Sequence, residues 1–246
     1  MQRLDQRKTD SLRDVKLTLG WNRYAEGSTL VEFGHTKVIC NATIESNVPK
    51  WLQGQEKGWV TAEYGMLPRS THERMRREKT STSGRSQEIS RLIGRSLRSC
   101  VDLYKLKDFQ ITVDCDVIQA DGGTRTAAIT GGFVALAQAL HYLHLKKLIT
   151  SFPLKNFVSA ISVGIYEGTP LLDLCYQEDC DAEVDSNFVI NDKLGIIEIQ
   201  GTAEENSFSR DQFNTMLDLA TKGCTELHEF QRMALNELGI ETLMGK

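Results

Sequence analysis

Long apolar runs are missing from this sequence. No stretch of 18 consecutive residues is free of polar side chains, and residues 1–14 are rich in charge. A membrane helix needs about 20 mostly apolar residues, and a signal peptide has an apolar core of roughly 7–15 residues. We therefore expect no membrane partner and no secretion signal, and we expect a cytoplasmic protein.

Closely spaced cysteine pairs are also missing. The six cysteines are scattered and form no CxxC motif: Cys40, Cys100, Cys115, Cys175, Cys180 and Cys224. Several of them lie inside apolar patterns typical of strands or helices. Zinc sites and disulfide frameworks depend on regular cysteine spacing, and disulfides belong to oxidising compartments. The pattern predicts free thiols in a reducing cytosol and argues against a zinc site.

Signs of disorder and of a domain linker are absent as well. Among the 246 residues, 40% are hydrophobic and 25% are charged, which are ordinary values for a globular chain. No segment rich in proline, glycine and serine divides the sequence. We therefore expect one domain that spans residues 1–246, long enough to bury a substantial core.

Acidic residues are scarce in one part of this acidic chain. Residues 69–98 contain nine basic and three acidic residues, although the whole chain has a formal charge of −4. A concentrated basic segment on an acidic protein suits a polyanionic partner. The segment begins inside residues 47–84, where little periodicity is visible and where we predict a long basic loop.

The predicted loop combines aromatic residues with arginines. Trp51, Trp59 and Tyr64 lie in its first half, and the arginines follow in its second half. Aromatic rings stack on unpaired bases and guanidinium groups bind phosphates, so this order favours single-stranded nucleic acid. The alternative is a solvated surface loop whose tryptophans pack into the core.

Apolar periodicity predicts strand groups that are each followed by a helix. Strands are expected at 15–19, 29–33, 36–44, 109–118, 158–166, 171–174, 184–190 and 195–200, and helices at 86–101, 133–143 and 209–231. Ser86 is the expected N-cap of the first helix. The order indicates an α/β (α+β) protein made of two pseudo-repeated β-α-β-α halves that pack as one unit.

One segment joins the central strand to the central helix with the chemistry of an anion site. Residues 119–131 read QADGGTRTAAITG, so Gly123, Thr124 and Arg125 stand where the helix begins. Free backbone N–H groups and the helix dipole favour an anion there, and an arginine can bind two phosphate oxygens. Arg85 lies at the start of another predicted helix and could reach the same anion. We predict a phosphate site, and the alternative is a glycine turn with a paired arginine.

A second segment gathers carboxylates. Residues 173–185 contain six acidic residues and no lysine or arginine: Asp173, Glu178, Asp179, Asp181, Glu183 and Asp185. Mg²⁺ binds one or two carboxylates together with water and substrate phosphates. A magnesium site beside the phosphate site is one interpretation, and an exposed acidic loop is the other.

Several long sequence motifs in this chain resemble those of the RNase PH family of phosphate-dependent 3′→5′ exoribonucleases. They are GSTLVEFG at 27–34, GWVTAEYGMLPR at 58–69, RLIGRSLR at 91–98, DCD at 114–116, residues 119–131, SVGI at 162–165 and QGTAE at 200–204. Departures are small, such as Ser186 and Phe188 around Asn187 where the family commonly has methionine and valine. The resemblance implies the RNase PH-type fold, which is ribosomal protein S5 domain 2-like.

The resemblance also implies an activity. Inorganic phosphate would attack the last phosphodiester bond of a tRNA precursor and release a nucleoside diphosphate. Family positions place the phosphate site at Arg85, Gly123, Thr124 and Arg125, the catalytic and Mg²⁺-binding acids at Asp179 and Asp185, and the tRNA-holding arginines at Arg69, Arg74 and Arg77. Arg125 would also be catalytic, and Asp179 is the better candidate for a general acid.

Family members form homohexameric rings built as trimers of dimers, so we expect the same assembly. The arginines that share a helix face, Arg91, Arg95 and Arg98, would then suit an interface. Two other functions remain as alternatives. One is a catalytically silent RNA-binding ring subunit, and the other is a hydrolytic metal nuclease that would release monophosphates.

Overall fold

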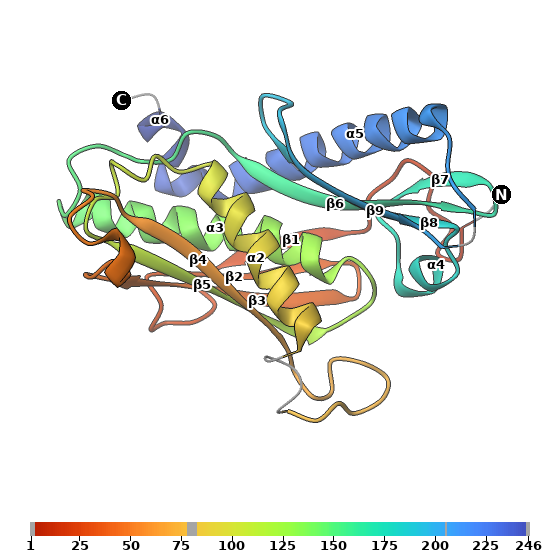
Figure 1. Cartoon of the computed structure of the whole chain (residues 1–246), viewed down its shortest axis with the longest axis horizontal. Helices are drawn as coiled ribbons and strands as arrows, with labels where there is room; N and C mark the ends of the chain where they lie inside the picture. The colour runs from red at the N-terminus through yellow and green to blue at the C-terminus, as the bar shows by residue number, and fades with distance from the viewer. Residues whose placement is uncertain (1–2, 78–82, 205, 245–246) are drawn as a thin grey trace.

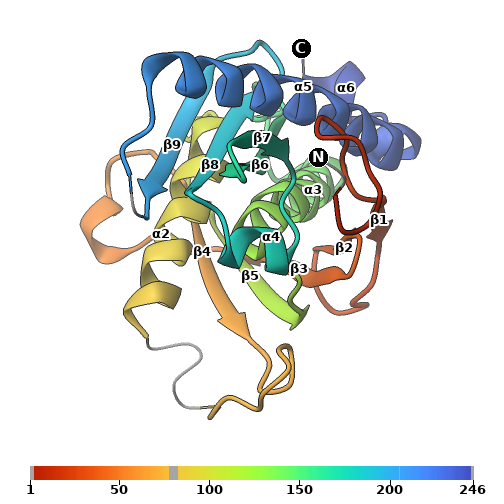
Figure 2. The ribbon, with the colours of Figure 1, turned by 90° about the vertical axis from the view of Figure 1, so that its right-hand side faces the viewer.

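Helix α3 (Thr124–Leu145) lies at the centre of the molecule, between two β-sheets (Figures 1 and 2). The computed structural model describes residues 3–77, 83–204 and 206–244. From one side to the other, the layers are the first sheet, helices α2 and α3, the second sheet and the long helix α5 (Figure 1). Both halves of the chain contribute to one continuous hydrophobic core.

The first sheet has five strands in the order β1-β2-β3-β5-β4. Their bounds are Val15–Leu19, Gly27–Phe33, Thr36–Glu45, Trp59–Met66 (β4) and Gln110–Gln119 (β5). All neighbours are antiparallel except β4 and β5, which are parallel. A parallel pair needs a long crossover, and helix α2 (Gly84–Ser99) lies in that connection. One short 3₁₀ helix, η1 (Lys50–Leu52), precedes β4.

The second sheet has four antiparallel strands in the order β7-β6-β8-β9. They are β6 (Val158–Tyr166), β7 (Thr169–Leu172), β8 (Val184–Asn191) and β9 (Ile196–Ala203), with the short helix α4 (Tyr176–Cys180) between β7 and β8. Helix α5 (Arg210–Leu235) covers the outer face of this sheet, and η2 (Asn236–Leu238) and α6 (Ile240–Leu243) follow it. A capping box of Ser209 and Gln212 begins α5.

The central helix is buried on almost every side. Its neighbours are β2 and β3 of the first sheet and β6 of the second. A helix enclosed in this way carries apolar residues all round, not only on one face. By length and composition α3 could cross a membrane, but 83% of its most apolar stretch is buried inside the protein. Such burial is the usual environment of a core helix.

The structure confirms a mixed α/β fold with two sheets and corrects three local predictions. The loop predicted at 47–84 contains β4, whose buried Val60, Ala62 and Tyr64 alternate with outward residues. Alanine and glycine have weak strand propensity, which hid this pattern. Helix α2 begins two residues before the expected Ser86, because Ser83 caps it. The turn after β6 lies at Glu167 and Gly168, so Thr169 and Pro170 already belong to β7. Residues 78–82 of the predicted loop lie outside the described residues.

Buried ion pairs attach the N-terminal segment to the second half of the chain. Arg13 binds both carboxylate oxygens of Asp173 through Nη2 at 2.7 Å and Nε at 3.1 Å. Arg3 binds Glu178 through Nη2 at 2.6 Å and Nε at 2.8 Å. The side chains of Asp173 and Arg3 are fully buried. The charge of Arg13 holds the pKa of Asp173 below its usual range, although burial alone would raise it.

We predict that Asp173→Asn destabilises the protein by about 3–5 kcal/mol, because it leaves Arg13 as a buried charge without its partner. Asparagine tolerates the positive φ of 56° at this position, so the substitution chiefly removes the charge. Urea unfolding measures the loss. Glu56→Gln, which breaks an exposed pair with Lys107, is the matched control and should leave the transition unchanged. Equal effects of the two variants would contradict the importance of the buried pair.

Candidate active site

A cavity of about 730 Å³ opens where the two halves of the chain meet. Its walls come from the start of α2, the start of α3, helix α4, strand β8 and the segment after β4. The residues that bear on chemistry are Arg85, Gly123, Thr124, Arg125, Asp179, Asp185 and Asn187. All phosphate-site and acidic-pair residues predicted from the sequence therefore line one cavity, although they are separated by up to 100 residues along the chain.

Two glycines shape the loop at the start of α3. Gly122 has a φ of 73°, and a Cβ atom there would lie 2.6 Å from the carbonyl oxygen of Leu174. Gly123 is the N-cap, with a φ of 64°. Glycine adopts this left-handed conformation without steric cost. The loop therefore turns closely against the second half of the chain, and the first N–H groups of α3 have no carbonyl partner within the helix.

Buried polar groups that the sequence analysis did not identify hold this loop in place. Thr36 Oγ1 donates to the carbonyl of Gly122 at 2.6 Å and accepts from the backbone N–H of Asp121 at 2.9 Å. Arg13 donates to the carbonyl of Asp121 while it binds Asp173. The sequence signal was Asp173 itself, because an acid between two apolar residues needs a buried cation.

The two arginines of the predicted phosphate site differ in their surroundings. Arg125 is largely buried, donates to Gln200 Oε1 at 3.1 Å and lies 3.7 Å from the carboxylate of Glu88. Arg85 is exposed at the mouth of the cavity, in the first turn of α2. Both guanidinium groups act on the acidic pair, since each one opposes the rise in the pKa of Asp179. Positive charge therefore surrounds the start of α3 from two directions.

The structure separates the six acids of residues 173–185 into three groups. Asp173 and Glu178 are neutralised by buried arginines. Asp181 accepts a hydrogen bond from Gln177, and Glu183 accepts one from the backbone of Gly168, both at exposed positions. The remaining two, Asp179 on α4 and Asp185 on β8, line the cavity. The exposed-loop interpretation thus holds for two acids and not for this pair.

Burial and mutual repulsion change the acidity of the pair. Burial raises the pKa of Asp185 to about 6, and the neighbouring Asp179 contributes to the rise. Burial also raises the pKa of Asp179, while Arg125, Arg85 and a hydrogen bond with Asp185 oppose the change. Two carboxylates can share a hydrogen bond only when one of them carries a proton. Both carboxyl groups of the metal-free pair therefore keep a proton to a higher pH than a free aspartate does.

The acidic pair has the donor chemistry that Mg²⁺ prefers. Asp185 Oδ1 is buried and has no hydrogen-bond partner. A hard cation satisfies such an oxygen, and Mg²⁺ commonly takes one or two carboxylates and fills its other positions with water and phosphate. Within the described residues, no cluster of three or more His, Cys, Asp or Glu side chains could hold a metal. The residues present fit Mg²⁺ only as a partial set of ligands.

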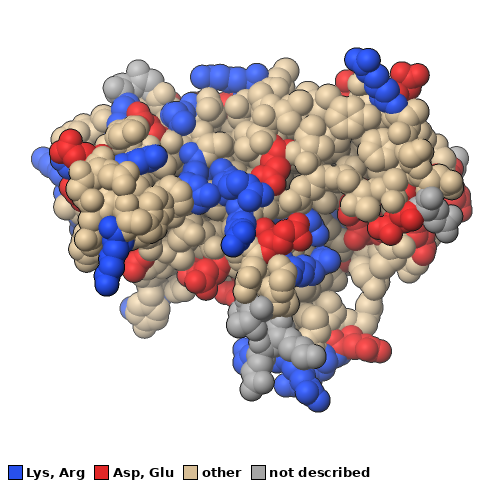
Figure 3. Space-filling model, viewed as in Figure 1, with Lys and Arg blue, Asp and Glu red and all other residues tan. Residues whose placement is uncertain are grey.

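The basic loop protrudes beside the cavity (Figures 1 and 3). Residues 71–73 and Met75 line the cavity wall, and the N–H of Ala120 donates to the carbonyl of Ser70 at 2.8 Å. Arg69, Arg74 and Arg77 are exposed. Arg69 donates to the carbonyl of His72. These arginines therefore belong to a loop that lines the cavity, whereas the sequence could place them only on a loop of unknown position.

The aromatic residues of the predicted loop lie elsewhere than expected. Trp59 starts β4, whose other end reaches the cavity at Met66, roughly 23 Å away at the usual strand rise. The guanidinium group of Arg98 stacks over Trp59 with a carbon-to-centroid distance of 4.3 Å. Tyr64 is buried. None of these contacts supports base stacking at the cavity. On the same face of α2, Arg95 pairs with Glu198, and Arg91 is exposed.

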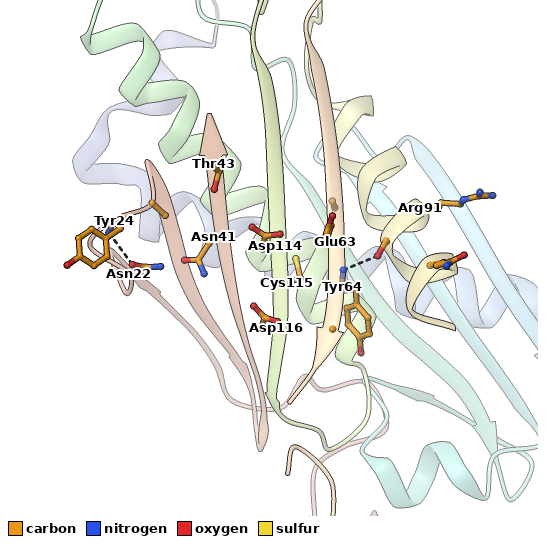
Figure 4. Close-up of a pocket in the computed structure, with 15 residues that line it drawn as sticks. Asn22, Tyr24, Asn41, Thr43, Glu63, Tyr64, Arg91, Asp114, Cys115 and Asp116 are labelled. Atoms are coloured by element: carbon orange, nitrogen blue, oxygen red, sulfur yellow. Dashed lines mark hydrogen bonds between the residues drawn. The ribbon is translucent and has the colours of Figure 1, made fainter. Parts of the chain in front are cut away.

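A second cavity, of about 680 Å³, lies on the outer face of the first sheet (Figure 4). Glu63, Asp114 and Asp116 project from the neighbouring strands β4 and β5 (Figure 4). Burial and repulsion from Glu63 raise the pKa of both aspartates. The lining holds these three carboxylates and one basic side chain, Arg91, a balance of charge that disfavours a polyanion. The phosphate chemistry therefore belongs to the first cavity.

The first cavity combines a helix start, two arginines and a pair of carboxylates, which is the equipment of an enzyme that acts on phosphate esters. Comparison with known proteins identifies the family. Residues 11–140 match the first domain of the 3′ exoribonuclease family, and residues 156–223 match its second domain. The chain is 58% identical over 236 residues to Ribonuclease PH of Bdellovibrio bacteriovorus, covering 96% of this chain and 97% of that protein.

Solved structures share the fold at low sequence identity. An archaeal exosome core matches with a TM-score of 0.76 and 19% identity over 94% of this chain and 91% of the other. An Archaeoglobus fulgidus exosome with RNA bound to the active site gives 0.77 and 20% over 93% and 92%. Rice (Oryza sativa) Rrp46 gives 0.76 and 20% over 95% and 100%. These likenesses establish the fold.

The chain belongs to the RNase PH family, and it is a phosphorolytic 3′→5′ exoribonuclease. The RNase PH-type fold expected from the sequence is confirmed. The catalytically silent alternative is not favoured, and the arginines and aspartates that it would have lost are all present at the cavity.

We predict that the Asp185 carboxyl group of the metal-free protein titrates near pH 6, because burial and Asp179 both disfavour its charged form. NMR titration of the side-chain carboxyl carbon measures the midpoint. Asp179→Asn removes the neighbouring negative charge and should lower that midpoint. A midpoint near 4 in the unsubstituted protein would contradict the described environment.

Proposed function

We propose that the enzyme trims the 3′ ends of tRNA precursors, with inorganic phosphate as the attacking co-substrate and Mg²⁺ as the metal. The observation that carries this proposal is the meeting of anion-binding groups and the acidic pair in one cavity. In the reaction, a phosphate oxygen forms a bond to the last phosphorus atom of the RNA, and the bond from that phosphorus to the upstream 3′ oxygen breaks. The product is a nucleoside diphosphate.

Inorganic phosphate binds at the start of α3. The N–H groups after Gly123 and the hydroxyl group of Thr124 donate to its oxygens, and Arg85 and Arg125 neutralise its charge. The contact of Arg125 with Gln200 keeps the guanidinium group oriented across the cavity. Phosphate and the RNA backbone are both anions and repel each other. Bringing them side by side is the main contribution that these groups make to catalysis.

Asp179 and Asp185 hold Mg²⁺ when the substrates are present. Mg²⁺ held there would supply positive charge that stabilises the reacting phosphates. The unpartnered Oδ1 of Asp185 supports this assignment. A proton must reach the 3′ oxygen of the shortened RNA as the bond breaks, and the acidic pair is the proton source within the cavity. In that step Asp179 is the candidate for the general acid, as expected from the sequence, and Asp185 then holds the metal alone, since Mg²⁺ takes one or two carboxylates.

The basic loop holds the body of the tRNA. Arg69, Arg74 and Arg77 are exposed on the loop whose residues 71–73 and Met75 line the cavity. An RNA with its 3′ end in the cavity would pass beside this loop. Contacts to the RNA backbone are mainly electrostatic and independent of sequence. A cytoplasmic location agrees with this substrate and with six free cysteines.

A homohexameric ring, built as a trimer of dimers, completes the proposal. The outer face of the first sheet carries Glu63, Asp114 and Asp116 (Figure 4), and Glu63 and Asp116 are exposed. Its charge complements the basic loop, so a second copy is a suitable occupant. The mass of the protein in solution, measured by light scattering, tests this assembly.

A product assay tests the function directly. RNA with a 3′ overhang is incubated with Mg²⁺, with and without inorganic phosphate, and the released nucleotides are separated. We expect nucleoside diphosphates only when phosphate is present. Asp179→Asn should lower turnover by at least about a hundredfold and leave RNA binding intact, because it removes charge from the reacting centre but not from the loop. Release of monophosphates without phosphate would instead indicate a hydrolase.

Arg74→Ala should weaken tRNA binding about three- to tenfold, because one phosphate contact is lost. The slope of the logarithm of the binding constant against the logarithm of the salt concentration should become less negative by about one. Fluorescence anisotropy over a range of salt concentrations measures both effects. Trimming of a short unstructured RNA should change less. Lys193→Ala removes an exposed charge from the turn between β8 and β9 and is the control. Equal loss on tRNA and short RNA would contradict a tRNA-holding role.

A further inference from the structure

Tyr64 reaches the phosphate site from inside the core. Its side chain belongs to the hydrophobic core and is only 3% exposed, so the ring has no surface on which an RNA base could stack. Its hydroxyl oxygen lies 2.8 Å from Thr124 Oγ1. The two residues are 60 positions apart in the sequence, on β4 and at the first position of α3.

The direction of this hydrogen bond follows from the chemistry of the phosphate site. A threonine hydroxyl group has one proton to donate and can accept other protons. If Thr124 donates its proton to a phosphate oxygen, its own oxygen is left to accept from Tyr64. Burial raises the pKa of Tyr64, so the phenol keeps its proton at neutral pH.

We propose that Tyr64 is a positioning residue for inorganic phosphate. It donates a hydrogen bond to Thr124 Oγ1 and thereby orients the Thr124 hydroxyl group as a donor to the co-substrate. This inference rests on the phosphate site of the proposed function and extends it to a residue that does not touch phosphate.

Two neighbouring elements, β5 and α2, fix the backbone of Tyr64. Strand β4 pairs Tyr64 with Cys115 of β5. The N–H of Tyr64 donates to Ser90 Oγ at 2.9 Å, and Ser90 donates to the carbonyl of Ser86 at 2.8 Å, both on α2. Helix α2 also carries Arg85 in its first turn. Tyr64 therefore connects the helix that supplies Arg85 to the helix that supplies Thr124.

Tyr64→Phe tests the role because phenylalanine keeps the packed ring and removes only the donor. We expect the KM for phosphate and its dissociation constant, measured by calorimetry with inorganic phosphate, to rise about five- to tenfold. The kcat at saturating phosphate and the KM for RNA should change less than twofold. Thermal unfolding verifies that the variant is folded, and Tyr104→Phe, at an exposed tyrosine, is the matched control.

A double-mutant cycle gives the decisive result. Thr124→Val should also weaken phosphate binding, and Tyr64→Phe added to Thr124→Val should cause no further loss, because the shared hydroxyl group is already absent. Additive losses would overturn the inference, and so would a Tyr64→Phe effect that falls on kcat and on RNA equally. If Thr124→Val leaves phosphate binding unchanged, the proposed phosphate site itself is wrong.

Discussion

The buried ion pair of Arg13 and Asp173 is the interaction on which the arrangement of the active site depends. Asp173 follows β7 in the second half of the chain, and Arg13 precedes β1 in the first half. The same guanidinium group also binds the carbonyl of Asp121 in the loop before α3. One pair, with both side chains buried, therefore fixes the loop of one half against the acids of the other.

This constraint explains why the cavity uses residues from both halves. The anion-binding groups start helices α2 and α3, whereas the carboxylates lie on α4 and β8. Close approach of the halves requires Gly122, since a Cβ atom there would collide with the backbone after β7. Burial that results from this approach raises the pKa of Asp185 and strengthens every charge interaction in the cavity. Stability and chemistry thus depend on the same contact.

Neutralisation decides which acids are available for chemistry. Six acids lie close together in the sequence, yet arginines from the N-terminal segment neutralise Asp173 and Glu178 completely. Only Asp179 and Asp185 combine partial burial with access to the cavity. The arginines of the basic loop differ again, because they are exposed and act over a distance on a polyanion. Position in the fold, not residue type, separates structural charges from catalytic ones.

The sequence by itself determined most elements, the family, and the residues Arg85, Gly123, Thr124, Arg125, Asp179 and Asp185 that meet in the cavity. Alternating apolar residues and long family motifs are local signals, so they are visible in the sequence without coordinates. Only the tertiary structure showed β4, which weak strand formers had concealed, and the N-terminal arginines that hold Asp173 and Glu178. It also showed that Tyr64, which was expected to stack on RNA bases, is buried and forms a hydrogen bond with Thr124. Such partners are distant in sequence, and only folding brings their atoms into contact.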